Sequence, residues 1–585
     1  MSAPADSFRI TLAQLNPTVG DIAGNAAKAR AARVKAAADS SDLMVLPELF
    51  IAGYPPEDLV AKPAFPAACR AAIESLARET ADGGPAMLIG TPWLEEGRLY
   101  NACALLADGR IAALRFKANL PNYGVFDEAR LFARGPAAGP VSVRGVRIGV
   151  PICEDIWLEE SEDYENVVET LAETGAEIVV VPNGSPYSRD KNDLRLSVAV
   201  ARVTESSLPL VYLNQVGGQD ELVFDGASFV LNADLSVAAQ LPAFAESITT
   251  LTWSRDGDTW HCAGPVASLP EGDEADYAAC VLGLRDYVSK NGFAEVLLGI
   301  SGGIDSALCA VMAVDALGAD RVRGVMLPYR YTAQISQDDA ALLAANLGIG
   351  YEVLPIAEAV EGFEKILSGA FAGLSPDVTE ENLQARTRGT ILMALSNKRG
   401  AMLVTTGNKS EMSVGYATLY GDMNGGFNPI KDITKTAVFR LAALRNGWKP
   451  EGALGPAGAV IPERIITRPP SAELRENQTD QDALPPYDVL DAILERLVEK
   501  EQPLAEIVTA GFDRDTVVRI DQLLARAEYK RRQAAPGVKV SSRNFGRDRR
   551  YPITNRFRDT AEAAPSADEA LVSRGGRASI DAFEG

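Results

Sequence analysis

The amino-acid sequence predicts an α/β protein built from two domains. Strand-like apolar runs alternate with helix-like segments, a proline- and glycine-containing stretch divides the chain, and a glycine-rich turn joins a strand to a helix in the second half. At about 100–200 residues per domain, 585 residues allow two to four domains, or two large ones. We place a first domain at residues 1–264, a linker at 265–276, a second domain at 277–560, and a poorly ordered tail at 561–585.

The first domain is predicted to be a layered α/β unit, because strands there alternate with helices. A helix is predicted at residues 24–38, which are rich in Ala, Lys and Arg. Strands are predicted at residues 9–15, 42–47, 86–90, 146–152, 178–182, 210–214 and 227–232.

The second domain is predicted to hold a parallel sheet. A helix at 277–290 leads into an apolar strand, and a glycine-rich turn then leads into a helix at 307–317. Neighbouring parallel strands are predicted at 322–327 and 401–406. Residues 466–487 are rich in Pro, Asp, Glu and Gln, and are predicted to form a long surface loop of the kind that often serves as a lid or binding loop.

Composition and charge exclude several classes of protein. A net charge of −22 would repel a polyanion, so small-molecule substrates are predicted and a nucleic-acid partner is not. No signal peptide and no run of about 18 apolar residues is present, so no membrane partner is predicted. The six scattered cysteines lack a C-x-x-C pair, which argues against a disulfide framework and favours the cytoplasm. His261 is the only histidine, which argues against Ser-His-Asp and Cys-His catalysis.

The most informative motif is Ser301-Gly-Gly-Ile-Asp-Ser306, which lies between an apolar strand and a helix. Glycines allow a tight turn close to a ligand, and the unpaired N–H groups and dipole of a helix start favour an anion. No Gly-Lys-Ser/Thr follows, so the motif is not a Walker loop. It resembles the PP-loop of ATP pyrophosphatases, which split ATP into AMP and pyrophosphate; a glycine-rich turn without a ligand is the alternative. The resemblance implies that ATP, a co-substrate, contacts Gly299, Ile300, Ser301, Gly302, Gly303, Ile304, Asp305 and Ser306.

Three polar residues of the first domain stand at predicted strand ends or in loops. Glu48 follows Val-Leu-Pro, Lys117 lies in Arg-Phe-Lys-Ala-Asn, and Cys153 lies in Pro-Ile-Cys-Glu-Asp. A thiolate is the effective cysteine nucleophile, and a carboxylate and an ammonium group supply a base and an oxyanion stabiliser without histidine. Taken singly, the cysteine is most often a small buried hydrophobe, and the two charged residues are solvated side chains.

Together these segments resemble the nitrilase (carbon–nitrogen hydrolase) superfamily over residues 8–260. The resemblance implies an αββα sandwich. It also implies that Cys153 attacks a carboxamide carbon, Glu48 takes the thiol proton and Lys117 steadies the oxyanion. The second glutamate of that family would be Glu128.

Further polar segments follow in the second half. Thr405 to Glu411 and Tyr420 to Asp422 come after a predicted strand, and a basic cluster, Lys530 to Arg532, stands out in an acidic chain. Phosphates need cations, and magnesium needs hard oxygen ligands. A solvated helix face is the alternative explanation of the basic cluster.

With these segments, residues 8–557 resemble the family of glutamine-dependent NAD synthetases, which couple a nitrilase-type glutaminase to a Rossmann-like PP-loop domain (adenine nucleotide α-hydrolase-like). The resemblance implies that deamido-NAD, ATP and L-glutamine give NAD, AMP, pyrophosphate and glutamate through an acyl-adenylate, and that ammonia passes between the sites. It implies a homo-oligomer containing at least a synthetase-domain dimer. The implied contacts are Tyr123, Ser185 and Lys191 for glutamine; Thr406 and Lys435 for ATP; Asp305 and Glu411 for Mg²⁺; and Asn382, Arg386, Glu411, Asp422 and Lys530 for deamido-NAD.

Rival functions remain at this stage. GMP synthetase needs a Cys–His–Glu glutaminase, and asparagine synthetase needs a cysteine directly after the initiator Met, where this chain has Ser2. PP-loop tRNA-thiolating enzymes usually carry extra cysteines and basic surfaces. A regulatory nucleotide-binding protein with a degenerate amidase domain is the non-enzymatic alternative. Tyr529 stands where certain ammonia-only NAD synthetases carry histidine.

Overall fold

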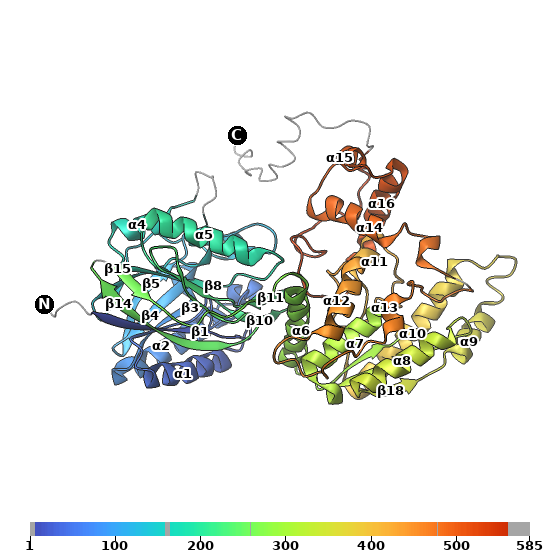
Figure 1. Ribbon diagram of the computed structural model, residues 1–585, viewed down its shortest axis with the longest axis horizontal. Coiled ribbons are helices and arrows are strands. Elements are labelled where there is room, and N and C mark those ends of the chain that lie inside the picture. Colours follow the sequence, from blue (N-terminus) through green and yellow to red (C-terminus); the bar gives the residue numbers. More distant parts are fainter. Residues whose placement is uncertain (1–5, 158–163, 258, 477, 560–585) are drawn as a thin grey trace.

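The computed structural model describes residues 6–157, 164–257, 259–476 and 478–559. Two α/β bodies lie side by side, the first formed by the blue-to-green half of the chain and the second by the green-to-red half (Figure 1). The predicted tail at 561–585 lies outside the described residues. In the described part of the chain, no helix is both long and apolar enough to cross a lipid bilayer.

Two stacked sheets form the first body. The seven-stranded sheet has the order β15-β14-β1-β2-β3-β4-β5, and the six-stranded sheet has the order β13-β12-β9-β8-β7-β6. The strands of the first sheet are β1 (Ser7–Gln14), β2 (Leu43–Val45), β3 (Ala86–Glu95), β4 (Arg98–Ala107), β5 (Arg110–Phe116), β14 (Ser247–Asp256) and β15 (Thr259–Cys262). Those of the second are β6 (Val141–Val143), β7 (Val146–Gly149), β8 (Ile178–Asn183), β9 (Leu210–Asn214), β12 (Phe229–Leu231) and β13 (Val237–Gln240).

Period-two alternation along the strands explains the layering. Ile10 and Leu12 of β1 pack against Val180 of β8 in the core between the sheets, whereas Val179 and Val181 face outward and pack under α5 (Lys191–Ser206). Helices α1 (Ile22–Ala38) and α2 (Ala64–Glu79) cover the outer face of the first sheet, and α4 (Val167–Glu173) joins α5 on the second. The predicted αββα sandwich is therefore confirmed.

The second body is built on a parallel sheet of order β18-β17-β16-β19. Because β17 lies on one side of β16 and β19 lies on the other, the strand order reverses beside β16, and a crevice forms at the carboxyl ends of these parallel strands. The strands are β16 (Val296–Gly299), β17 (Val322–Met326), β18 (Gly350–Val353) and β19 (Met402–Leu403). The surrounding helices include α6 (Gly272–Lys290), α7 (Ile304–Leu317), α8 (Gln334–Leu347), α9 (Ala357–Leu367), α10 (Val378–Arg399) and α12 (Lys435–Gly447).

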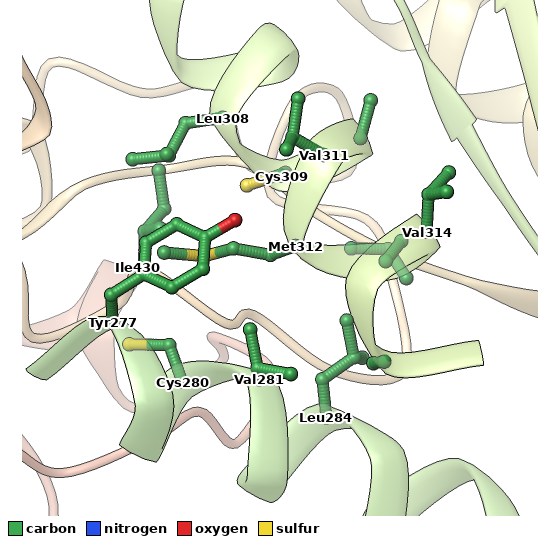
Figure 2. Packing of buried hydrophobic residues seen from close by; sticks show 14 of the residues in the cluster. Tyr277, Cys280, Val281, Leu284, Leu308, Cys309, Val311, Met312, Val314 and Ile430 are labelled. Carbon is green, nitrogen blue, oxygen red and sulfur yellow. The ribbon is translucent and has the colours of Figure 1, made fainter. Parts of the chain in front are cut away.

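Helix α7 lies in the centre of the second core, and α6 packs along it. Figure 2 shows Cys280 and Leu284 of α6 facing Met312 and its neighbours on α7. The hydroxyl of Tyr277 donates to the buried Asp315 carboxylate at 2.6 Å, so even the polar end of this ring is satisfied. Helix α6 begins at Gly272, five residues before the predicted helix start at 277.

A helical cap completes the second body. Its apolar core includes Leu490, Ile507, Ile520 and Leu524. The helices involved are α11 (Lys409–Val414), α14 (Tyr487–Leu494), α15 (Leu504–Thr509), α16 (Arg514–Arg526) and α17 (Glu528–Arg531). The predicted loop at 466–487 begins within α13 (Glu463–Thr467) and ends at the first residue of α14; between these helices its described residues are irregular apart from a short turn at Asp480–Asp482.

The two bodies meet where α6 packs against a hairpin of the first body, β10 (Val216–Gln219) and β11 (Leu222–Asp225). The Asp286 carboxylate on α6 accepts from the Asn16 side-chain amide at 2.6 Å and from Gly218 N–H at 2.8 Å. Lys290 donates to the carbonyl oxygens of Pro17 and Gly218 at 2.9 and 2.8 Å. These charge-assisted hydrogen bonds fix the helix of one domain on the hairpin of the other.

Candidate active sites

Three charged side chains converge at the end of the first sheet. Lys117 follows β5, and its ammonium group lies 2.7 Å from Glu48 Oε1 and 2.9 Å from both oxygens of Glu128. Glu128 opens the short helix α3 (Glu128–Leu131), and Glu48 follows β2. The Lys117 and Glu48 side chains are 0% exposed, so both carboxylates depend on the one ammonium group for charge compensation.

Burial disfavours the charged form of Lys117, but Glu128 and Glu48 outweigh it and hold its pKa well above the usual value. Burial raises the pKa of Glu128, against the opposing effect of Lys117. Lys117 is therefore a permanent cation in this site, and Glu128 is the carboxyl group that protonates more readily than usual.

Cys153 begins a short turn that follows β7, and its backbone has a φ of 46°, in the left-handed region that non-glycine residues rarely occupy. Its thiol is buried and is influenced electrostatically by Glu48, Lys117, Glu154 and Glu128. Burial, followed by the charge of Glu48, raises the thiol pKa well above its usual value. The resting group is thus a thiol that needs a base before it attacks.

Two uncharged residues that sequence reasoning missed complete the cluster. The Asn101 amide donates to Glu48 Oε1 at 2.7 Å and to Glu128 Oε2 at 3.2 Å, and the Tyr54 hydroxyl donates to Glu128 Oε1 at 2.8 Å. Gly184 N–H donates to Glu48 Oε2 at 2.8 Å. The Glu48 carboxylate is thereby held by three donors, which fixes its orientation.

The predicted glutamine-pocket residues lie around the same turn. The Tyr123 hydroxyl donates to the Glu154 carboxylate at 3.0 Å, beside Cys153. Lys191, at the start of α5, stands 4.8 Å from the centre of the Trp157 ring. Ser185 is buried, and its carbonyl oxygen accepts from the Arg195 guanidinium group at 2.8 Å. A carboxylate and an ammonium group thus flank the thiol, a pattern that suits a zwitterionic amide substrate.

In the second body, the glycine-rich motif joins β16 to α7, as predicted. Gly302 has a φ of 81°, and a Cβ there would lie 2.2 Å from the Ser336 carbonyl oxygen, so only glycine fits. The Ser301 hydroxyl accepts from Gly303 N–H at 3.2 Å and lies 3.1 Å from the Ser306 hydroxyl. These bonds fix the shape of the loop, and the loop and the start of α7 line the crevice beside β16, where a helix start favours an anion.

Lys435, at the start of α12, joins the two carboxylates predicted to bind Mg²⁺. Its ammonium group lies 2.5 Å from Asp305 Oδ2 and 3.1 Å from Glu411 Oε1. Burial raises the pKa of Glu411 to about 7, against the opposing effect of Lys435. In the described part of the chain, no three His, Cys, Asp or Glu side chains are grouped to hold a metal. Asp305 and Glu411 supply only two carboxylate ligands. They fit Mg²⁺ if phosphate and water oxygens supply the rest of its coordination shell.

A cavity of about 330 Å³ opens over this loop. Its walls include every predicted ATP-binding residue, Gly299 to Ser306 with Thr406 and Lys435, together with Glu411 and Asp422. The loop predicted at 466–487 contributes Arg468 to Leu474 and Asp480. Arg468 donates to Ser336 Oγ at 2.7 Å, so this loop is fastened beside the glycine-rich turn and lines the cavity.

Three predicted deamido-NAD residues lie outside the described lining of this cavity. Asn382 accepts from the Thr418 hydroxyl at 2.8 Å, and Arg386 donates to the Leu419 carbonyl oxygen at 3.2 Å. Lys530 donates to the Gly415 and Ala417 carbonyl oxygens at 2.8 and 2.7 Å. All three therefore hold the 415–419 segment at the edge of the cavity. Burial lowers the pKa of Lys530, against the opposing effect of Asp422.

Comparison with known proteins finds both families that the motifs resemble. A carbon–nitrogen hydrolase family model matches residues 9–257, and an NAD synthase family model matches residues 276–534. A glutamine-dependent NAD(+) synthetase of Rhodobacter capsulatus is 56% identical over 555 residues, which cover 95% of this chain and 99% of the relative. The chain belongs to the glutamine-dependent NAD(+) synthetase family. The family resemblance inferred from the motifs is therefore confirmed.

Other members of the family give the same result. The glutamine-dependent NAD(+) synthetase of Xanthomonas campestris pv. campestris is 48% identical, with 94% of this chain and 98% of the relative covered. The solved structure of the Acinetobacter baumannii family member, in complex with adenosine diphosphate, superposes with a TM-score of 0.74 at 42% identity, covering 94% of this chain and 99% of that one. A Cytophaga hutchinsonii structure, at 23% identity and a TM-score of 0.78, shows the shared fold.

Proposed function

We propose that this chain is a carbon–nitrogen ligase that converts deamido-NAD, ATP and L-glutamine to NAD, AMP, pyrophosphate and L-glutamate. Its membership of the glutamine-dependent NAD(+) synthetase family supports this function. The observation that carries the proposal is the pairing of a buried Cys–Glu–Lys cluster with a PP-loop cavity in one folded chain.

In the first site, Cys153 attacks the carboxamide carbon of glutamine, and Glu48 takes the thiol proton. This role for Glu48 is supported by its charge influence on the thiol and by the three donors that fix its carboxylate. Lys117 steadies the tetrahedral oxyanion as a buried, permanent cation. Ammonia leaves, and water hydrolyses the thioester to glutamate.

Around this centre, Glu128 holds Lys117 in place through two hydrogen bonds of 2.9 Å. Glutamine lies among Tyr123, Ser185 and Lys191, where the Lys191 ammonium group meets the substrate carboxylate. Enclosure of this site favours neutral ammonia, the nucleophile that the second site needs, over ammonium.

In the second site, the nicotinate carboxylate of deamido-NAD attacks the α-phosphorus of ATP, and pyrophosphate leaves. The N–H groups of the Ser301–Ser306 loop and the Lys435 ammonium group bind the phosphates, and Thr406 is a further ATP contact. Deamido-NAD contacts Asn382, Arg386, Glu411, Asp422 and Lys530. Ammonia then attacks the acyl-adenylate, which yields NAD and AMP.

Asp305 and Glu411 are the residues that would hold Mg²⁺. The ion would neutralise charge on the phosphates of ATP when bound. Lys435 lies between the two carboxylates and lines the same cavity, where its ammonium group would contact a phosphate of ATP.

The surroundings of the enzyme follow from the same family membership. We propose a homo-oligomer that contains at least a synthetase-domain dimer, and a location in the cytoplasm. All six cysteines lie in the described part of the chain as free, buried thiols, which supports a reducing compartment. The partners are small molecules, and neither a nucleic acid nor a membrane is among them.

The decisive experiment separates the two sites. In Cys153→Ala, glutamine-driven NAD synthesis should fall to background, whereas ammonia-driven synthesis should stay near the wild-type rate, because the PP-loop cavity is built by other elements. Products are measured at end point with deamido-NAD, ATP-Mg and either nitrogen donor. Cys69→Ala, which removes a buried thiol on α2, is the matched control and should keep both activities. Loss of both activities in Cys153→Ala would contradict the division of labour.

A further inference from the structure

The turn that carries Cys153 and the loop that carries Lys117 come from strands of different sheets, and one side chain lies between them. Asp155 is 3% exposed. Its Oδ2 accepts from Ile152 N–H at 2.9 Å, directly before Cys153. Its Oδ1 accepts from Ala118 N–H at 3.0 Å and from Asn119 N–H at 2.8 Å, directly after Lys117.

We propose that Asp155 is a positioning residue that sets the separation of Cys153 and Lys117 for glutamine hydrolysis. The inference rests on the proposed function, because the separation matters only if the thiol and the ammonium group act on one substrate. Asp155 is distinct from the reacting groups: its carboxylate oxygens are occupied by three backbone donors, and it acts through the residues that it holds.

The chemistry of the three neighbours requires a carboxylate. All three are N–H donors, and an ionised carboxylate is the side chain that offers acceptors on both oxygens. An asparagine would have to turn its NH₂ group toward Ile152 N–H or toward the other two donors. In either orientation the NH₂ group faces a backbone N–H donor, so the hydrogen bonds on that side of the side chain are lost.

Cys153 needs such an external restraint. Its φ of 46° is sparsely populated for a residue with a side chain, and a conformation of this kind persists only where the surroundings enforce it. The loop that carries Lys117 is already anchored, because the Asn119 side chain donates to the Glu165 carbonyl oxygen at 2.9 Å and accepts from Glu165 N–H at 3.1 Å. Loss of the bond to Ile152 therefore loosens the backbone next to Cys153, and loss of the other two bonds releases the cysteine turn from a lysine loop that stays in place.

The test is Asp155→Asn in the full chain, assayed for glutamate release from glutamine and for ammonia-driven NAD synthesis. We expect kcat for glutamine hydrolysis to fall about 100-fold, as for a displacement of about 1 Å between reacting groups. The KM for glutamine should change less than about threefold, because Ser185 is held by Arg195 and Asn214, outside the cysteine turn. Ammonia-driven synthesis should not change.

Asp42→Asn is the matched control. Its carboxylate also accepts a backbone N–H, that of Arg9 at 2.8 Å, but it lies at the opposite end of β2 from Glu48, and this variant should keep the wild-type kcat. The proposal is overturned if Asp155→Asn keeps kcat within about threefold of wild type, or if its loss is in KM alone. It is also overturned if ammonia-driven synthesis falls in parallel, since Asp155 would then support the whole fold. A wild-type chain without glutamine hydrolysis would instead contradict the proposed function.

Discussion

Removing the Lys117 charge tests how the first site holds two buried carboxylates. Lys117, Glu48 and Glu128 together carry a net charge of −1, and Lys117→Met leaves −2 in the same buried space. The side chains of the three residues are 0%, 0% and 6% exposed, so water compensates almost none of this change. Breaking a buried ion pair by removing one partner typically costs about 3–5 kcal/mol, and we expect a loss of that size in the free energy of unfolding.

The double variant Lys117→Met/Glu128→Gln returns the net charge to −1. We expect it to regain about 2–3 kcal/mol over the single variant, because an amide can stay buried with the Tyr54 hydroxyl and Asn101 as partners. It should not regain glutamine hydrolysis, since the cation that steadies the oxyanion is still missing. Stability and activity thus separate in one pair of variants.

Urea denaturation followed by tryptophan fluorescence measures these losses. Trp93, Trp157, Trp253 and Trp260 lie in the first domain and Trp448 alone in the second, so the signal reports mainly the domain that is changed. A double variant no more stable than Lys117→Met would refute the reasoning, as would a loss below about 1 kcal/mol in Lys117→Met.

The same perturbation has a pH signature. Burial raises the pKa of Glu128 in the folded protein, and Lys117 opposes that rise. Without Lys117, the folded state binds a proton at Glu128 more tightly than the unfolded state, where the pKa is about 4.3. The stability of Lys117→Met should therefore fall as pH rises above that value, more steeply than in wild type, and Lys117→Met/Glu128→Gln should lose the extra dependence.

Two further predictions concern the second site. Gly302→Ala places a Cβ 2.2 Å from the Ser336 carbonyl oxygen at a φ of 81°, so ammonia-driven NAD synthesis should fall at least about 10-fold with a raised KM for ATP. Glutamine hydrolysis should not change in this variant. The control is Gly362→Ala on α9, where the added Cβ meets open space. A normal KM for ATP in Gly302→Ala would contradict the assignment of this loop as the phosphate-binding loop. Burial raises the pKa of Glu411 to about 7, so the apparent affinity for Mg²⁺ in the ammonia-driven reaction should fall as pH drops through 7. Glu411→Gln should abolish that dependence, and its persistence there would exclude Glu411 as the titrating group.

The sequence was sufficient for the parts of the fold and site that leave a local pattern. Apolar runs that end in a polar residue located Glu48 and Cys153, and a strand followed by a glycine-rich turn located Ser301–Ser306. Such patterns work because parallel strands end at one edge of a sheet, where polar side chains meet in space. The layered α/β character followed from the alternation of strands and helices, whereas the αββα order came from the family resemblance.

Asn101 and Tyr54 could not be found in this way. Asn101 lies inside β4, where a polar residue among apolar ones has meaning only through Glu48 and Glu128, which are far away in the sequence. Asp155 was visible as part of the Cys-Glu-Asp segment, but its role depends on three backbone donors from two loops. Hydrogen-bond partners of this kind are set by tertiary structure and leave no periodicity in the sequence.

The glycine pair in β10 shows most clearly what cannot be predicted from the sequence. Gly217-Gly218 favours a turn when considered alone, yet the pair lies in a strand where two domains approach each other. A Cβ on Gly217 would lie 2.1 Å from Asn16 Oδ1, and one on Gly218 would lie 3.0 Å from the Gly283 Cα of α6. Gly218 thus meets the other domain, whereas Gly217 meets a side chain of its own domain, and a single sequence encodes neither contact locally.

That packing explains why the linker in the sequence does not by itself determine how the two sites face each other. The hairpin that receives α6 ends at Asp225, which pairs with Arg195 at 2.8 Å, and Arg195 in turn donates to the Ser185 carbonyl oxygen at 2.8 Å. Both members of this pair are about 1% exposed, so the connection is rigid. The helix that covers the synthetase core is therefore joined through one hairpin and one buried ion pair to Ser185, in the wall of the proposed glutamine pocket. A rigid interface of this kind keeps the proposed ammonia-producing site and the proposed ammonia-accepting site at a fixed relative position. A flexible linker of similar length would not do so.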